Sequence, residues 1–238
     1  MGIRRGSIST PIIADGLVFN MDAANRASTI PSTSTTTCKD TINLSVSGSF
    51  LGGCEFSSEN NGVWTFDGVD EDSIKLNDTL DHLPLGDNAR TMCTWAKPNS
   101  TGWGSVERGM LQYGNLGTAQ LSLISLTNLG YFHFKGYFRD VNFSSTDYRD
   151  NQWHYFVAAY EGSRIIHGYV DGNFISTKTI PNNILATISG DDNSIGDYHT
   201  AGDNSWNGLI GNCHIYNRAL SANEVLHNYN ALKSRFGL

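Results

Sequence analysis

The chain has 238 residues, a formal net charge of −7, 39% hydrophobic residues, 25 glycines and 5 prolines. This composition is typical of a single globular domain with many turns, and it excludes collagen-like and disordered chains. A modestly acidic surface is a poor partner for the phosphates of nucleic acid, which need a basic face. No apolar stretch approaches the length that spans a bilayer, so we expect no membrane insertion.

Residues 1–13 are predicted to form an N-terminal arm outside the domain, which we place at residues 14–238. Residues 1–10 are small, polar or basic and show no hydrophobic periodicity. They form either a frayed end or an arm that docks onto a neighbouring subunit. They carry no apolar segment of the kind found in a signal peptide, so we expect synthesis and assembly in the cytoplasm. The candidate docking residues of the arm are Ile3, Arg4, Arg5, Ile12 and Ile13.

The remainder of the chain predicts many short strands separated by turns. Apolar and aromatic runs predict strands at residues 17–21, 64–66, 74–76, 91–97, 110–113, 120–126, 131–138, 152–160, 165–170, 174–179 and 206–216, with a short strand near residue 195. Asp171-Gly172 is a strong hairpin signal. Residues 28–62, which are rich in Ser and Thr and then in Gly and Asn, predict a long loop.

Three of these strands also predict which face is buried. In residues 91–97, Met92 shares a face with every second residue, and Trp95 lies on the opposite face. Residues 152–160 are aromatic on both faces, which predicts a central strand that is buried on both sides. In residues 131–138 the phenylalanines, including Phe138, are predicted to form the core face.

One helix is predicted, and it ends the chain. Ser221 is a good N-cap, and Glu224 stands three residues later, where its carboxylate can complete a capping box. Leu220 and Val225 are spaced for a hydrophobic staple, and Gly237 can adopt the left-handed conformation that closes a helix. Short strands with a single helix predict an all-β fold, an antiparallel two-sheet sandwich with one short C-terminal helix.

Several motifs carry a resemblance to a known family. The run from Tyr216 to Ser221, followed by a helix and the ending Arg235-Phe236-Gly237-Leu238, resembles the end of a laminin-G-like, concanavalin A-like jelly-roll domain. Phe66-Asp67-Gly68, Trp153-His154 and Val170-Asp171-Gly172 resemble other strands of that domain. The version that these motifs resemble most is the one in structural proteins of tailed bacteriophages.

This resemblance implies a non-enzymatic virion protein, either a capsid decoration (cement) protein or a head-fibre protein on the particle surface. Its implied partners are the major capsid protein or other virion subunits, and by analogy the chain forms a homo-oligomer such as a trimer. The alternative is a lectin-like adhesion module of a tail fibre that binds a host glycan. A glycan would need exposed aromatic rings, and Trp103, Tyr148 and Tyr198 fall in predicted loops.

A glycosidase is disfavoured by the carboxylates of the sequence. Retaining enzymes need two carboxylates about 5 Å apart, which on a strand means acidic residues at alternate positions. The closest match, Asp70-Glu71-Asp72, adjoins a turn, and Glu107 and Glu161 are isolated. We therefore expect no catalytic residues.

A calcium ion is the one cofactor that the sequence raises, because laminin-G-like domains often carry one. Carboxylate and amide oxygens are suitable ligands. The candidates are Asp191, Asp192, Asn193, Asp197, Asp203 and Asn204. The alternative is a hydrated acidic loop.

The cysteines leave one question open. Cys93 and Cys213 lie in apolar strand patterns and are expected to be buried thiols. Cys38 and Cys54 lie in a polar segment, and they either close a short loop as a disulfide or remain free, since sequence does not fix the geometry of a bridge.

Overall fold

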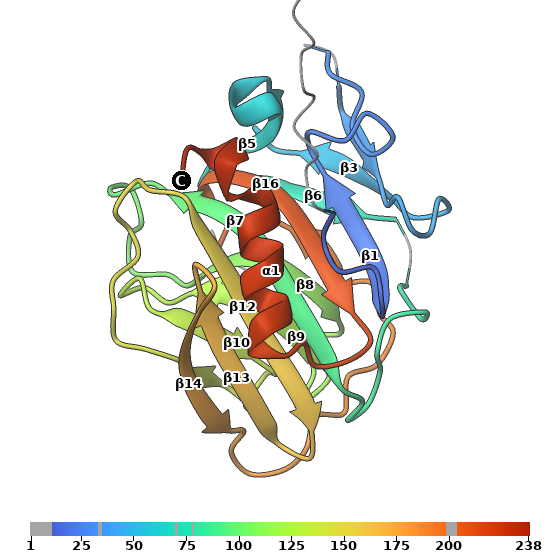
Figure 1. Cartoon of the computed structure of the whole chain (residues 1–238), viewed down its shortest axis with the longest axis vertical. Coiled ribbons are helices and arrows are strands. Elements are labelled where there is room, and N and C mark those ends of the chain that lie inside the picture. The colour runs from blue at the N-terminus through green and yellow to red at the C-terminus, as the bar shows by residue number, and fades with distance from the viewer. Residues whose placement is uncertain (1–10, 33–34, 70, 78, 199–203) are drawn as a thin grey trace, which may run out of the picture.

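The computed structural model describes residues 11–32, 35–69, 71–77, 79–198 and 204–238. In this part of the chain, two antiparallel eight-stranded sheets face each other, and one α-helix lies over the outer face of one of them (Figure 1). The predicted all-β sandwich with a short C-terminal helix is confirmed.

Sheet A contains the longest strands. Its order is β14-β13-β12-β7-β16-β5-β4, and β1 also pairs with β16. Its strands are β1 (Leu17–Asp22), β4 (Glu55–Ser57), β5 (Val63–Asp67), β7 (Arg90–Pro98), β12 (His154–Gly162), β13 (Ile165–Val170), β14 (Asn173–Thr179) and β16 (Asn207–Tyr216). Strand β16 pairs with two strands along the same edge. Its residues 207–210 pair with β5, and its residues 212–216 pair with β1.

Sheet B has the order β11-β10-β9-β8-β15-β6-β3-β2. Its strands are β2 (Thr37–Lys39), β3 (Ser47–Leu51), β6 (Ser73–Leu76), β8 (Arg108–Gly114), β9 (Leu121–Leu126), β10 (Phe132–Lys135), β11 (Val141–Asn142) and β15 (Ser194–Ile195).

The expectation of a long loop at residues 28–62 was wrong. The described part of this segment holds β2, β3, β4 and a 3₁₀ turn, η1 (Glu59–Asn61). These strands are short and rich in small polar residues, so they carry little local signal. They are held instead by pairing with β6 and β5, and long-range pairing of this kind overrides propensity.

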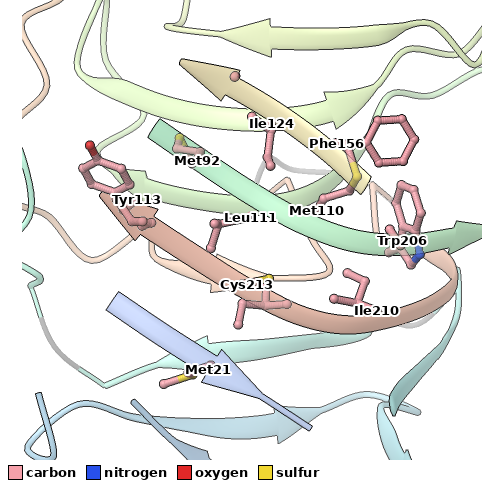
Figure 2. Packing of buried hydrophobic residues seen from close by; sticks show 14 of the residues in the cluster. Met21, Met92, Met110, Leu111, Tyr113, Ile124, Phe156, Trp206, Ile210 and Cys213 are labelled. Carbon is pink, nitrogen blue, oxygen red and sulfur yellow. The ribbon is translucent and has the colours of Figure 1, made fainter. Parts of the chain in front are cut away.

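The main core fills the space between the sheets. Figure 2 shows side chains from both sheets meeting there, among them Met92, Met110, Phe156, Trp206 and Ile210. The predicted faces of β7 and β12 are confirmed, because alternate residues of each strand enter two different apolar clusters.

The second cluster lies between sheet A and the end of the chain. Helix α1 (Ala222–Leu232) and the 3₁₀ turn η2 (Lys233–Phe236) cover the outer face of the sheet (Figure 1). Phe236 packs against Trp95 and Trp153, with ring centroids 4.4 Å away in each case. Gly211 makes room for this ring, since a Cβ there would lie 2.6 Å from Phe236.

The predicted capping box starts α1. The Ser221 side chain accepts the backbone N–H of Glu224, and the Glu224 carboxylate accepts the backbone N–H of Ser221 at 2.9 Å. Arg218 also donates two hydrogen bonds to this carboxylate, at 3.0 and 2.6 Å. The chain therefore turns from β16 into α1 through a fixed polar junction.

The base of the predicted arm lies on the chain's own helix. The Ile13 N–H donates to Asn228 Oδ1 at 2.8 Å, and the Tyr216 hydroxyl donates to the Ile13 carbonyl at 3.0 Å. His227 Nε2 lies 2.9 Å from the Pro11 carbonyl. Ile12 lines a cavity beside the helix. The other predicted docking residues, Ile3, Arg4 and Arg5, lie outside the described residues.

All four cysteines are buried free thiols, so Cys38 and Cys54 are not bridged. Burial raises the pKa of Cys38 and of Cys93 to about 12, which leaves both thiols protonated and unreactive. None of the helices within the described ranges is long and apolar enough to span a bilayer.

Candidate functional site

The three loop aromatics that the sequence offered as a glycan platform are buried. Trp103, Tyr148 and Tyr198 are 3%, 8% and 7% exposed. Trp103 meets Trp206 edge-on at 5.4 Å, and Tyr148 meets Phe156 edge-on at 5.4 Å. All three rings lie in apolar clusters, so the expected exposure of these rings was wrong. Whether this chain binds a glycan stays a prediction.

Two of the calcium candidates use their side-chain oxygens to hold backbone N–H groups. Asp192 Oδ2 accepts the N–H of Leu116 at 2.9 Å, and Asn193 Oδ1 accepts the N–H of Gly114 at 2.9 Å. No group of three or more His, Cys, Asp or Glu residues suited to a metal occurs in the described part of the chain. Asp203 lies outside that part. The side-chain oxygens of Asp192 and Asn193 therefore fix the backbone of residues 114–116.

The acidic turn after β5 uses its carboxylates structurally. Asp72 is buried, and it accepts the N–H groups of Gly53 and, at 2.8 Å, of Asp67. Burial raises the pKa of Asp72 to about 6, and the neighbouring Asp67 adds to the rise against the backbone hydrogen bonds. Asp70 lies outside the described residues. Asp72 therefore closes a turn.

A polar cluster stands on the outer face of sheet B. Ser125 of β9 and His133 of β10 are cross-strand partners, and Glu107 lies just before β8. One Glu107 oxygen lies 2.7 Å from His133 Nδ1 and 2.5 Å from Ser125 Oγ. Its other oxygen lies 2.5 Å from Lys135 Nζ.

The Glu107 carboxylate is held in its charged form. Burial by itself would raise its pKa, but the hydrogen bonds and charges of His133 and Lys135 outweigh burial and lower the pKa to about 2. The same contact raises the pKa of Lys135 against the effect of its own burial. The ion pair is therefore complete at neutral pH, and it fixes the Lys135 side chain on the sheet.

A small pocket opens beside this ion pair. It has a volume of about 190 Å³ and is lined by Lys135, Tyr137, Phe138, Asp140 and Tyr198. Lys135 Nζ lies 4.5 Å from the centroid of the Tyr198 ring. We call these five residues the sheet B pocket. It offers aromatic rings, one cation and one carboxylate within one concave surface.

The turn after β10 turns an aromatic ring out of the domain. Strand β10 ends at Lys135, and both Tyr137 and Phe138 have positive φ, of 52° and 65°. The backbone is tied there, because Ala119 N–H donates to the Tyr137 carbonyl at 2.9 Å and Gly136 N–H donates to Asp140 Oδ1 at 3.1 Å.

Phe138 is 64% exposed as a result, so its prediction as a core residue was wrong. The left-handed conformation is costly for bulky residues, and such strain gathers at functional sites. A core phenylalanine would not need it. The turn therefore places an exposed aromatic ring at the sheet B pocket.

Sequence reasoning offered one residue of this pocket, Tyr198, as a glycan contact, but it did not identify the other four. His133 and Lys135 alternate with the core residues Phe132 and Phe134, so their outward direction was readable from the strand pattern. Glu107 was dismissed as an isolated carboxylate, because its partners come from other strands. The two positive φ values carry no sequence signal, since neither residue is glycine.

Comparison with known proteins identifies the fold family. The family profile of the concanavalin A-like lectin/glucanases superfamily matches residues 67–226, more than half of the chain. The chain belongs to this superfamily. Its two-sheet architecture agrees with the jelly-roll fold. No curated protein matches the sequence.

Several solved structures share the fold at low sequence identity. Domain 4 of a GH43 extracellular arabinanase from Geobacillus stearothermophilus, solved in complex with arabinotriose, is 16% identical, with a TM-score of 0.64 over 90% of this chain and 98% of that one. The binding domain of Paraclostridial Mosquitocidal Protein 1 is 18% identical, with a TM-score of 0.67 and coverage of 91% and 52%.

A structure of botulinum neurotoxin type C, whose cell entry depends on interaction with two ganglioside molecules, is 11% identical, with a TM-score of 0.65 over 91% of this chain and 51% of that one. The 238-residue chain therefore spans about half of each toxin chain and nearly all of the arabinanase domain. At these identities the likeness concerns the fold alone.

Proposed function

We propose that this chain is a non-catalytic, lectin-like module that binds carbohydrate in the sheet B pocket. The observation that carries the proposal is Phe138, an exposed ring presented by a strained turn beside Lys135 and Asp140. The arabinanase domain with arabinotriose and the toxin that interacts with gangliosides support it as fold relatives.

The chemistry of the pocket suits a sugar. A pyranose ring presents C–H groups on its faces, which pack on an aromatic ring, and hydroxyl groups at its rim, which need charged or polar partners. Phe138 and Tyr137 supply the first, and Lys135 and Asp140 supply the second. A volume of about 190 Å³ is below the roughly 300–1,000 Å³ of drug-sized sites, so the pocket would hold one terminal residue of a glycan.

A binding role fits this site better than catalysis. A glycosidase needs one carboxyl group that is protonated near neutral pH and a second carboxylate close to it. Glu107 is ion-paired and its pKa is about 2, so it is a poor proton donor. Asp72, whose pKa is raised to about 6, is buried in a turn.

A glycan array with the purified chain tests the proposal. We expect binding to a subset of glycans that share one terminal sugar. The same array with Phe138→Ala should show the signals reduced at least about tenfold, since losing a hot-spot aromatic anchor costs about 2 kcal/mol or more and tenfold corresponds to about 1.4 kcal/mol. Phe174→Ala is the matched control, because Phe174 is a 55% exposed aromatic on the edge strand β14. An empty array, or equal loss in both variants, contradicts the proposal.

A second candidate function is the display of this module on a virion, as a capsid decoration or fibre protein. Its support is the position of Pro11–Ile13, which are pinned to α1 on the face of the sandwich opposite sheet B. A chain anchored through residues 1–10 would then turn the sheet B pocket outward, toward a host glycan.

Deletion of residues 1–10 tests this second function. The truncated chain should keep its fold, measured by circular dichroism, because Pro11–Ile13 remain on α1. It should no longer co-sediment with particles whose full-length chain has been removed. A truncated chain that still decorates the particle would contradict the anchoring role of residues 1–10. That result would not bear on the proposal that the sheet B pocket binds carbohydrate.

A further inference from the structure

The charges at the sheet B pocket are unequal in number. The charged residues that line it are one cation, Lys135, and one carboxylate, Asp140. A second carboxylate, that of Glu107, supports the pocket from behind Lys135, and one of its oxygens lies 2.5 Å from Lys135 Nζ. Two carboxylates are therefore gathered around a single ammonium group.

Glu107 balances the charge of Lys135. Both side chains are only 16% exposed, and a largely buried ion pair is screened little by salt. Burial alone would lower the pKa of Lys135, but Glu107, and after it Tyr198 and Asp140, raise it. Glu107 and Asp140 thus both act on the same ammonium. An ammonium has three N–H groups, so Lys135 still offers the pocket a hydrogen-bond donor while its charge is already compensated.

The Asp140 carboxylate has no ion pair of its own. Its Oδ1 accepts the Gly136 N–H at 3.1 Å, and among the described residues its Oδ2 has no hydrogen-bond partner. The adjacent Arg139 donates from Nη1 to the Phe138 carbonyl at 3.0 Å and does not line the pocket. Asp140 therefore gives the pocket one open acceptor oxygen and an excess of negative charge.

The aromatic walls hold a ligand next to this carboxylate. The rings of Tyr137 and Phe138 are nearly perpendicular, at 83°, with centroids 5.0 Å apart. Tyr137 and Tyr198 pack in the apolar cluster that contains Leu121 and Leu123, so these two rings are fixed on the sheet. A sugar that fills a volume of about 190 Å³ between such rings lies within reach of Asp140.

We infer that the sheet B pocket takes an uncharged terminal sugar and rejects acidic sugars, which carry a carboxylate or sulfate group. Asp140 Oδ2 would accept one ligand hydroxyl, and Lys135 would donate to another. An anionic substituent would instead meet Asp140 with no free cation to balance it, and like charges brought together disfavour the wrong partner. The inference rests on the carbohydrate-binding function proposed above, and it adds that Asp140 and Glu107 set the specificity.

Titration calorimetry with matched pairs of methyl glycosides tests the inference. Each pair compares glucose, galactose or mannose with its uronic acid, in which a carboxylate replaces the C6 hydroxymethyl group. We expect at least one neutral sugar to bind, and its uronate to bind at least about tenfold more weakly. Binding of the neutral sugar should change little with added NaCl, because salt screens only interactions between charges.

Two variants assign this preference to its residues. Asp140→Asn keeps an oxygen for the Gly136 N–H and removes the charge, and Glu107→Gln removes the charge that balances Lys135. We expect each variant to narrow the ratio of the neutral-sugar affinity to the uronate affinity, because each removes one negative charge beside the ligand. Asp81→Asn removes a charge at an exposed position outside the pocket, and it should leave the ratio unchanged.

The outcomes separate this inference from the function on which it rests. A uronate that binds the wild type as tightly as its neutral partner, or an unchanged ratio in both Asp140→Asn and Glu107→Gln, would overturn the inference and leave the carbohydrate-binding proposal standing. No binding of any sugar in either form would overturn both.

Discussion

The Arg235 guanidinium lies 2.7 Å from the Asp22 carboxylate and so joins the end of the chain to its first strand. Arg235 also donates to the carbonyls of Asn60, Gly62 and Gly211. Its side chain is only 10% exposed. One planar group therefore connects β1, η1 and β16, and it holds Phe236 against Trp95.

This geometry predicts that Arg235→Lys is nearly as harmful as Arg235→Ala. A lysine keeps the charge, but it is too short and lacks the fork of donors that reaches four acceptors. Losing one partner of a buried ion pair typically costs about 3–5 kcal/mol, and we expect each variant to lose at least about 2 kcal/mol of unfolding free energy in urea. Arg26→Lys, at an exposed position, is the control and should change stability by less than about 0.5 kcal/mol. A wild-type midpoint for Arg235→Lys would contradict the role of the fork.

The turn at Phe138 predicts a difference between two truncations. Both Phe138→Ala and Phe138→Gly remove the exposed ring, but only glycine adopts a φ of 65° without strain. Left-handed backbone costs an L-residue about 1–2 kcal/mol. We expect the glycine variant to be more stable than the alanine variant by about 1 kcal/mol in chemical denaturation, after the higher entropy of unfolded glycine is counted. Equal stabilities would show that the turn is relaxed.

The acidic pair at Asp67 and Asp72 predicts a rise in stability on acidification. The pKa of Asp72 is raised from 3.8 to about 6 in the folded chain, by burial first and by Asp67 in addition. The folded state then binds more protons than the unfolded state between these values, so stability falls as the pH rises through this range. Asp67→Asn should reduce this slope, measured as Tm against pH. An unchanged slope would contradict the contribution of Asp67.

For Glu224 we predict the opposite dependence of stability on pH, at lower pH values. Hydrogen bonds from Arg218, together with those of Ser221, lower its pKa from 4.5 to about 2 despite partial burial. This interaction stabilises the fold above the unfolded pKa and is lost as the pH falls toward 2. Glu224→Gln should destabilise the chain at neutral pH and lose less stability on acidification than the wild type. Parallel acid curves for the two proteins would refute the assignment.

Local patterns were sufficient for the strands that alternate strongly and for the helix. The alternation around Met92 and Trp95 gave both the strand and its two faces, and Ser221 with Glu224 marked the start of α1. Asn228 shows the limit of this approach. It is a fully buried polar residue on the helix, and its amide is satisfied by Tyr216 of the preceding strand and by Ile13, which lies 215 residues away in the sequence.

The functional surfaces were less predictable because they depend on tertiary contacts. The loop aromatics Trp103 and Tyr198 looked exposed, but packing buried both rings. Phe138 looked buried by alternation, but the strand stops three residues before it. In each case the exposure of the ring depends on the direction that the backbone takes in a turn, and the periodic pattern of the sequence does not extend into that turn.

The central claim, that the sheet B pocket binds carbohydrate, is tested most directly by titration calorimetry with the strongest glycan from the array. We predict saturable binding to the wild type and to Phe174→Ala. Affinity should fall at least about tenfold in Phe138→Ala and in Lys135→Met, because truncating a hot-spot anchor costs about 2 kcal/mol or more and tenfold corresponds to about 1.4 kcal/mol. Equal affinity in all four proteins, or no heat of binding for the wild type, would contradict the claim.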